Sequence, residues 1–415
     1  MNLTLKGKIS EITYLIIFKL VYDLVYIFFT TVRFEYIQSV LEFDIHHYII
    51  NWLVFIIYVI TTIFSLKHNS MAFVFKCIVI FSTIPTISLF GLKNIDVKAF
   101  WNIMGYWVLM LTFFLILQNV RLYKSVDSRD NTQINKISLK YTNFIFYISI
   151  IITLLLWGWL GNFNIITSFS SASESRLALR GIHIPSIVRY IMSWTGNVFL
   201  PFCFAIFLSK KKKWRASLTF FAGILLFSIN GMKTWLVIYP MIWSVFFTLK
   251  SRQNMTKVTN RIASISSIFG LTGLVLFYFY GESTIGALYH RIFSVPAEIN
   301  YNFYTFISEN EPLLLRESIF RFISDSPYDG RFTFLIGEIF TGNSAANANN
   351  GMFGDAYSNF KIFGLILYPF LISFVFKILT SVFRNEDISV STNILLILVW
   401  SLINTSFFTW LITGG

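Results

Sequence analysis

Charged side chains and cysteine are both scarce in this sequence of 415 residues. Only 13% of the residues are charged and 55% are hydrophobic, whereas about 25% of a typical soluble domain is charged. This composition excludes a water-soluble globule, a disordered chain and a coiled coil. The two cysteines, Cys77 and Cys203, lie inside apolar runs. Their placement argues against a disulfide framework and against a zinc site of the CxxC type.

Long apolar runs recur from one end of the chain to the other. A run of about 20 residues is long enough to cross a bilayer as a helix. The runs therefore predict an all-α polytopic membrane protein, with residues 1–415 as a single transmembrane domain. We expect about 11 transmembrane helices, near residues 12–32, 48–66, 71–90, 99–119, 142–160, 186–208, 216–230, 232–249, 263–281, 359–379 and 393–413.

Basic residues are distributed unevenly between the two sets of loops. If the N-terminus is cytoplasmic, the inside segments hold 19 Lys and Arg residues and the short outside loops hold six. The positive-inside rule then predicts an N-in, C-out topology. Topology and attraction to anionic lipids also account for the net charge of +13, so no nucleic-acid partner is needed.

The acidic residues show the opposite distribution, and two outside segments are unusually long. Fourteen of the 20 acidic residues fall outside, where they are not required for insertion. The first long loop covers residues 161–185 and the second covers residues 282–358, far beyond a usual connection. Many aromatic residues in the second loop predict that it is ordered. Its stretch 312–323 predicts a helix lying along the membrane surface. We therefore expect function on the outer face.

Cationic residues on the outer side are few and are candidates for binding an anionic substrate. Guanidinium groups bind phosphate or carboxylate in a bidentate way. The alternative is that these side chains reach lipid headgroups or pair with acids of the loops. The candidates are Arg176 and Arg180, which on a helix would share one face, followed by Arg189, Lys233 and Arg291.

Amides, a carboxylate and aromatic rings are concentrated at the end of the second loop. Asn347 and Asn350 precede Asp355 and Tyr357, which lead into an apolar run. Such groups hold sugar hydroxyls and ring faces, and Tyr301 is a further candidate of this kind. The alternative is a turn that starts a helix, with Asp355 as a favourable charge at its N-terminus.

Three weaker patterns remain. Glu298 and His290 are reserve candidates for a general base. Within the apolar runs, Lys19 and Asp23 are four residues apart, a spacing at which two side chains pair on one helix face. The first outer loop, which precedes the second predicted span, contains a cluster of acids and histidines: Glu42, Asp44, His46 and His47. Metal binding is the less favoured interpretation of this cluster.

Taken together, the sequence resembles the oligosaccharide repeat-unit polymerases, which make O-antigen or capsular polysaccharide in bacterial inner membranes. Four features carry the resemblance. They are the arginines of the first long loop, the string SINGMKTW at 228–235, the string RIFSVPAEINYNFY at 291–304 and the string NANNGMFGDAYSNFKIFG at 347–364. Together with the hydropathy profile, the resemblance covers residues 150–380 and, more loosely, the whole chain.

The resemblance implies a glycosyltransferase-C-like fold and a specific reaction. A growing glycan on undecaprenyl pyrophosphate would be transferred to an incoming lipid-linked repeat unit at the outer face of the plasma membrane. The arginines would bind the donor pyrophosphate, and Asp355 would be the preferred base for the acceptor hydroxyl. Neither a cofactor nor a metal is required. A chain-length regulator and a flippase would be functional partners, with membrane lipids around the chain.

Two other functions stay open. An O-antigen ligase shares the layout but transfers the finished glycan to lipid A-core, and His290 with Arg291 would then gain importance. A transporter or flippase for lipid-linked oligosaccharide would instead line a path through many spans with polar residues.

The resemblance predicts that Arg291→Ala and Asp355→Ala abolish polymer while insertion and expression stay intact. The measurement is the length and amount of polymer made by cells that carry each variant. Wild-type polymer from both variants would show that the site is assigned to the wrong residues.

Overall fold

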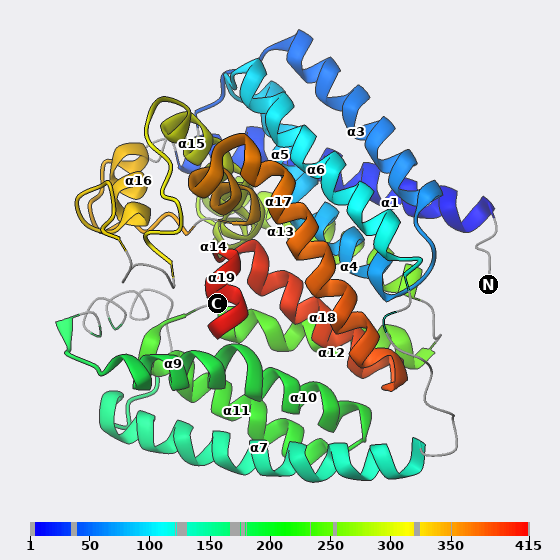
Figure 1. Cartoon of the computed structure of the whole chain (residues 1–415), viewed down its shortest axis with the longest axis vertical. Helices are drawn as coiled ribbons and strands as arrows, with labels where there is room; N and C mark the ends of the chain where they lie inside the picture. Colours follow the sequence, from blue (N-terminus) through cyan, green and yellow to red (C-terminus); the bar gives the residue numbers. More distant parts are fainter. Residues whose placement is uncertain are drawn as a thin grey trace. The chain divides into compact units, whose positions relative to one another are not determined.

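All regular secondary structure in the described part of the chain is helical. The computed structural model describes residues 5–34, 40–120, 122, 131–166, 175, 179, 181–232, 234–251, 255–318, 324–349 and 351–413. They form two compact units (Figure 1). Unit 1 comprises residues 1–120, 255–378 and 402–410, and unit 2 comprises residues 121–254, 379–401 and 411–415.

Eight helical segments of the described chain are long and apolar enough to cross a membrane, which supports a polytopic membrane protein. These segments are Leu5–Arg33, Ile45–Ser65, Ser70–Leu92, Val97–Leu117, Leu139–Leu160, Ser186–Ser209, Met255–Tyr280 and Met352–Val382. Each overlaps one of the predicted runs.

The other three predicted runs correspond to shorter helices. They are α11 (Lys213–Asn230), α12 (Thr234–Ser251) and the pair α18 (Ile388–Ile403) and α19 (Phe407–Thr413). Gly231 ends α11 with φ of 63°, a left-handed conformation that glycine adopts without strain. The predicted run 393–413 is thus interrupted between α18 and α19, and 11 spans stay a prediction.

Unit 1 is built around a fully buried central segment. This segment consists of α4 (Ser70–Ile78), a π-helical turn η3 (Val79–Thr83) and α5 (Ile84–Leu92), and its apolar stretch is buried throughout. The helices that contact it are α1 (Leu5–Val25), α3 (Ile45–Ser65), α6 (Val97–Leu117), α13 (Met255–Tyr280) and α15 (Val295–Glu309). A segment shielded on every side from lipid can carry polar side chains if these find partners within the protein.

Two buried ion pairs involve α1, one within the helix and one to α4. Lys19 Nζ lies 2.8 Å from Asp23 Oδ2 and also donates to Ser88 of α5. Lys76 Nζ of α4 lies 2.6 Å from Glu11 Oε1. The expected pairing of Lys19 with Asp23 is confirmed, whereas the partner of Lys76 is a residue 65 positions away.

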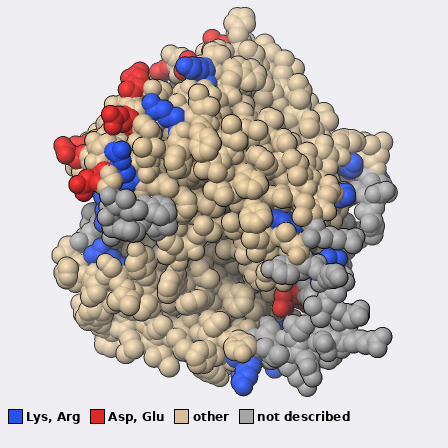
Figure 2. All heavy atoms as spheres, viewed as in Figure 1, with Lys and Arg blue, Asp and Glu red and all other residues tan. Residues whose placement is uncertain are grey.

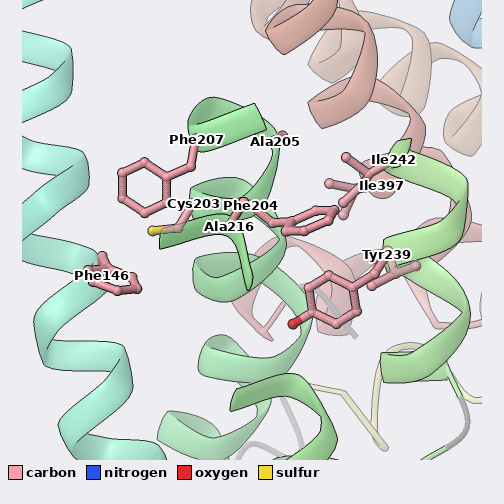
Figure 3. Packing of buried hydrophobic residues seen from close by; sticks show 10 residues of the cluster. Phe146, Cys203, Phe204, Ala205, Phe207, Ala216, Tyr239, Ile242 and Ile397 are labelled. Carbon is pink, nitrogen blue, oxygen red and sulfur yellow. The ribbon is translucent and has the colours of Figure 1, made fainter. Parts of the chain in front are cut away.

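Unit 2 packs its helices around aromatic and aliphatic side chains. Figure 3 shows Phe146 of α7 (Asn131–Leu160) beside Phe207 of α10 (Leu200–Ser209), with the rings perpendicular and their centroids 5.1 Å apart. Tyr239 of α12 and Ile397 of α18 belong to the same cluster. The unit also contains α9 (Ser186–Trp194) and a π-helical turn η5 (Thr195–Phe199). Cys203 in this core and Cys77 in unit 1 are buried free thiols.

The second long loop contains ordered helices. They are α14 (Thr284–Tyr289), a π-helical turn η6 (His290–Ser294), α15 and α16 (Phe332–Thr341). The predicted surface helix at 312–323 is wrong for its described part, because residues 314–318 form turns and Leu314 and Leu315 have positive φ. Their backbone N–H groups bond to α17 (Met352–Val382) instead of continuing a helix.

The exposed acidic side chains of unit 1 lie in the segments that join its helices at one end, which we call the outer end. In Figure 2 acidic side chains gather at the upper left, where Figure 1 draws α15 and α16. The exposed acids are Glu42, Asp44, Asp96, Glu282, Glu309, Glu311, Asp325, Asp329 and Glu338. This agrees with the uneven charge distribution of the sequence, and the side of the membrane that the outer end faces stays a prediction.

We expect Lys76→Met to lower the free energy of unfolding by about 3–5 kcal/mol, because it leaves the Glu11 carboxylate buried without its partner. The double variant Glu11→Leu, Lys76→Met should recover most of this loss. The measurement is thermal unfolding in detergent, with Lys6→Met at an exposed position as the control. Equal stability of Lys76→Met and Lys6→Met would contradict a stabilising role for the pair.

Candidate functional site

Three π-helical turns meet at the outer half of unit 1. Turn η6 contacts both η3 and η1 (Tyr26–Thr30), the latter extending α1 into α2 (Thr31–Arg33). Wide π turns are rare and occur often at functional sites. Here they bring the start of α15 against the ends of α1 and α5. We call Tyr26, Lys93, His290, Arg291 and Glu298 the outer cluster.

The carboxylate of Glu298 is buried in this cluster. It lies in the first turn of α15, where a negative charge is favourable, and it is 8% exposed. The hydroxyl of Tyr26 donates to its Oε1 over 3.0 Å. This bond fixes the carboxylate in position, and a carboxylate can keep such a bond while it accepts a proton.

The imidazole of His290 is neutral and covered. It is 2% exposed and stacks on the ring of Phe34, with centroids 4.3 Å apart. Neither ring nitrogen has a hydrogen-bond partner within the described chain. Burial, aided by the positive charges of Arg291 and Lys93, lowers the pKa of His290 to about 3. As packed, His290 is a buried neutral ring and is closed to a substrate in solvent.

Positive charge surrounds the covered imidazole. Arg291 follows His290 in η6 and is exposed, and Lys93 ends α5 at the same end of the unit. A further cation, Arg33, lies 3.9 Å from Glu282 at the surface. Arg291 and Lys93 both act on His290, and a guanidinium and an ammonium are the groups that bind an anion such as a phosphate.

Asp355 occupies a different and more structural position. It lies in the first turn of α17 and is 3% exposed. Its Oδ2 accepts from the backbone N–H of Phe407, the first residue of α19, over 2.7 Å. Its Oδ1 accepts from the amide of Asn359 over 2.9 Å. Loss of product in Asp355→Ala therefore does not distinguish a missing base from a missing helix contact.

The predicted sugar-binding residues are mostly packed inside the unit. The hydroxyl of Tyr301 donates to the carbonyl of Thr86 over 2.8 Å. Tyr357 stacks on Tyr304 of α15, with centroids 4.6 Å apart. Asn347 is half-buried, and its Oδ1 has no hydrogen-bond partner in the described chain. Among these groups, Asn347 is the one with a polar atom left over for a ligand. Asn350 lies outside the described residues.

The cations predicted in the other outer segments belong to unit 2. Arg189 is exposed on α9, so it is accessible to an anionic group or to lipid headgroups. Arg176, Arg180 and Lys233 lie outside the described residues, and their roles stay predictions.

In the first outer loop, the carboxylate of Asp44 bonds to the start of a helix. Asp44 precedes α3, and its Oδ1 accepts from the backbone N–H of His47 over 2.8 Å, which lowers the pKa of Asp44. The ring of His47 stacks on Phe90. No group of three or more His, Cys, Asp and Glu side chains in the described ranges could hold a metal ion.

Comparison of the chain with known protein families, with curated proteins and with solved structures found no match.

Sequence reasoning missed Tyr26 and Lys93. In the sequence, Tyr26 is one of many aromatic residues in an apolar run, and Lys93 counts only toward topology. The one available signal is a polar hydroxyl near the end of the first run. Its partner Glu298 is 272 residues away, a contact that periodicity cannot predict.

His290→Phe should flatten the dependence of stability on pH below neutrality. In the unfolded chain the imidazole takes up a proton as the pH falls below its ordinary pKa of 6.5, but in the fold it does so only near a pKa of about 3. The wild-type chain therefore loses stability as the pH falls through this window, by at most about 1.4 kcal/mol per pH unit from this group.

The measurement is thermal unfolding in detergent at about pH 7.5 and about pH 5, with His183→Phe at an exposed histidine as the control. Parallel losses of stability in the wild-type chain and in His290→Phe would rule out this explanation.

Proposed function

We propose that this protein is a glycosyltransferase that polymerises lipid-pyrophosphate-linked oligosaccharide units at the outer face of a bacterial plasma membrane. The growing glycan would leave its undecaprenyl pyrophosphate and join the incoming unit, as O-antigen or capsular polysaccharide. The observation that carries the proposal is the outer cluster. There the buried carboxylate of Glu298 lies where three π turns converge, and two cations lie near His290 of the same cluster.

The residues of the outer cluster suit the two demands of this reaction. The acceptor hydroxyl needs a base, and Glu298 is a fixed carboxylate with Tyr26 as its hydrogen-bond donor. The leaving pyrophosphate needs positive charge, which Arg291 and Lys93 supply. On this geometry Glu298 replaces Asp355 as the favoured base, because the carboxylate of Asp355 accepts from the first backbone N–H of α19 and so has a structural role.

The surroundings of the cluster suit a lipid-linked substrate. Unit 1 exposes large apolar side chains along its membrane-spanning helices, for example Phe363 and Ile362 of α17 and Ile57 of α3. A polyprenyl chain would remain in the lipid while its headgroup reaches the outer end. The N-in, C-out topology of the sequence would put that end outside the cell.

A flippase for the same lipid-linked unit is the second candidate, favoured by the two ion pairs within the spans. Charged residues inside a membrane protein often mark a transport path. Lys19 and Asp23 are both buried and are also within reach of Tyr48, whose hydroxyl donates to Asp23. The ligase alternative depends on His290 as base, and this imidazole is covered by Phe34.

Reconstitution tests the proposal. Purified protein in vesicles is given the lipid-linked repeat unit extracted from cells that lack this chain, and the products are separated by size. We expect a ladder spaced by one unit, and we expect Glu298→Gln to reduce it by about 100-fold or more. Glu309→Gln, an exposed acid on the same helix, is the matched control.

Each other result points to a different function. A ladder that persists in Glu298→Gln would remove Glu298 as the base. A single new band that needs lipid A-core and finished polymer would indicate a ligase. Movement of the lipid-linked unit across the bilayer without any ladder, abolished by Lys19→Met, would indicate a flippase.

A further inference from the structure

Helix α17 is broken at Lys361. This residue has φ of 47° and ψ of −130°, a conformation that residues other than glycine rarely adopt. The part before the break is buried from Met352 to Asn359, whereas the part after it exposes Ile362 and Phe363. The break thus separates a buried helical segment from one whose surface faces lipid.

The carbonyl groups before the break are bonded to the second long loop. The backbone N–H of Leu313 donates to Ser358 O over 2.8 Å, and that of Leu314 donates to Asn359 O over 3.2 Å. The N–H of Leu315 donates to the side-chain Oδ1 of Asn359 over 2.8 Å. Leu314 and Leu315 reach these positions with φ of 51° and 65°, so the loop is also strained where it docks.

The same two carbonyls have a second possible set of partners. In a continuous helix, Ser358 O would accept from Ile362 and Asn359 O from Phe363. No proline lies between Met352 and Tyr368, so the sequence permits this helix. Lys361 would then return to ordinary helical φ. In this continuous helix the main-chain carbonyls of Ser358 and Asn359 would keep the same number of hydrogen bonds. Lys361 would lose its strained conformation.

The bent form in turn depends on Gly364. A Cβ at this position would lie 1.9 Å from the carbonyl oxygen of Ala356, eight residues earlier in the chain. A continuous helix separates residues 356 and 364 by two turns, so a side chain at position 364 would not meet Ala356 in that form.

We propose that α17 is a two-state element whose bending docks the second long loop and whose straightening releases it. In the bent form, residues 313–315 complete the broken helix and cover Asn359, which is bonded to Asp355. In the continuous form the helix satisfies its own carbonyls, and the loop loses two of its three acceptors, the carbonyls of Ser358 and Asn359. The element therefore controls whether the polar first turn of α17 is closed or open toward the outer end.

Cysteine labelling tests the two states without any assay of enzyme activity. Leu313 is 3% exposed, so Leu313→Cys in the full chain in lipid vesicles should react slowly with a water-soluble maleimide. Adding Gly364→Ala should raise the rate about tenfold or more, and adding Lys361→Gly should lower it to a similar degree. The chain without the new cysteine gives the background from Cys77 and Cys203, which are buried.

Gly105→Ala is the matched control. Gly105 lies in α6, and a Cβ added there would meet no neighbouring atom within 4 Å, so this variant should leave the rate unchanged. Amide hydrogen exchange of the peptide that contains Ile362 and Phe363 adds a second readout. Straightening slows exchange there in Gly364→Ala, whereas general loosening speeds it up.

Unchanged labelling in both Gly364→Ala and Lys361→Gly would overturn the proposal. So would faster labelling accompanied by faster exchange at Ile362 and Phe363. If Gly364→Ala fails to insert into the membrane, the labelling rate of Lys361→Gly decides alone. Glycine adopts positive φ without strain, so this variant should stabilise the bent form.

Discussion

The cost of leaving a charge or a main-chain carbonyl unpaired away from water is the constraint on which the described architecture depends. In an apolar environment an unpaired carbonyl or charge costs several kcal/mol. Lys76 is therefore paired with Glu11 and Lys19 with Asp23. The broken end of α17 follows the same rule, since the loop at Leu313 supplies the donors that its carbonyls need.

This constraint also explains how a site can exist within an apolar bundle. The central segment α4–η3–α5 is shielded from lipid on all sides, so polar groups can pack against it at low cost. Glu298 and His290 approach it from the second long loop through a π turn. The loop is thus part of the fold of unit 1, and it supplies the acid that we propose to be the base.

Two groups singled out from the sequence have unexpected surroundings in the fold. The sequence favours Asp355 as a base because it follows a run of amides, yet its carboxylate bonds the N-terminus of α19. His290 attracts interest because it precedes an arginine, yet it is covered by Phe34. Both residues are identified from local composition. Local composition does not report which residues distant in the chain will surround a side chain.

The sequence by itself determined the apolar runs, the helical class and the pairing of Lys19 with Asp23, because these depend on neighbours within about one or two helical turns. It also indicated that acids gather at one end. Only the tertiary structure decided that Lys76 pairs with Glu11, that Tyr26 bonds to Glu298 and that α17 bends at Lys361. The physical reason is that each of these depends on contacts between segments far apart in the chain, whose energies no local pattern contains.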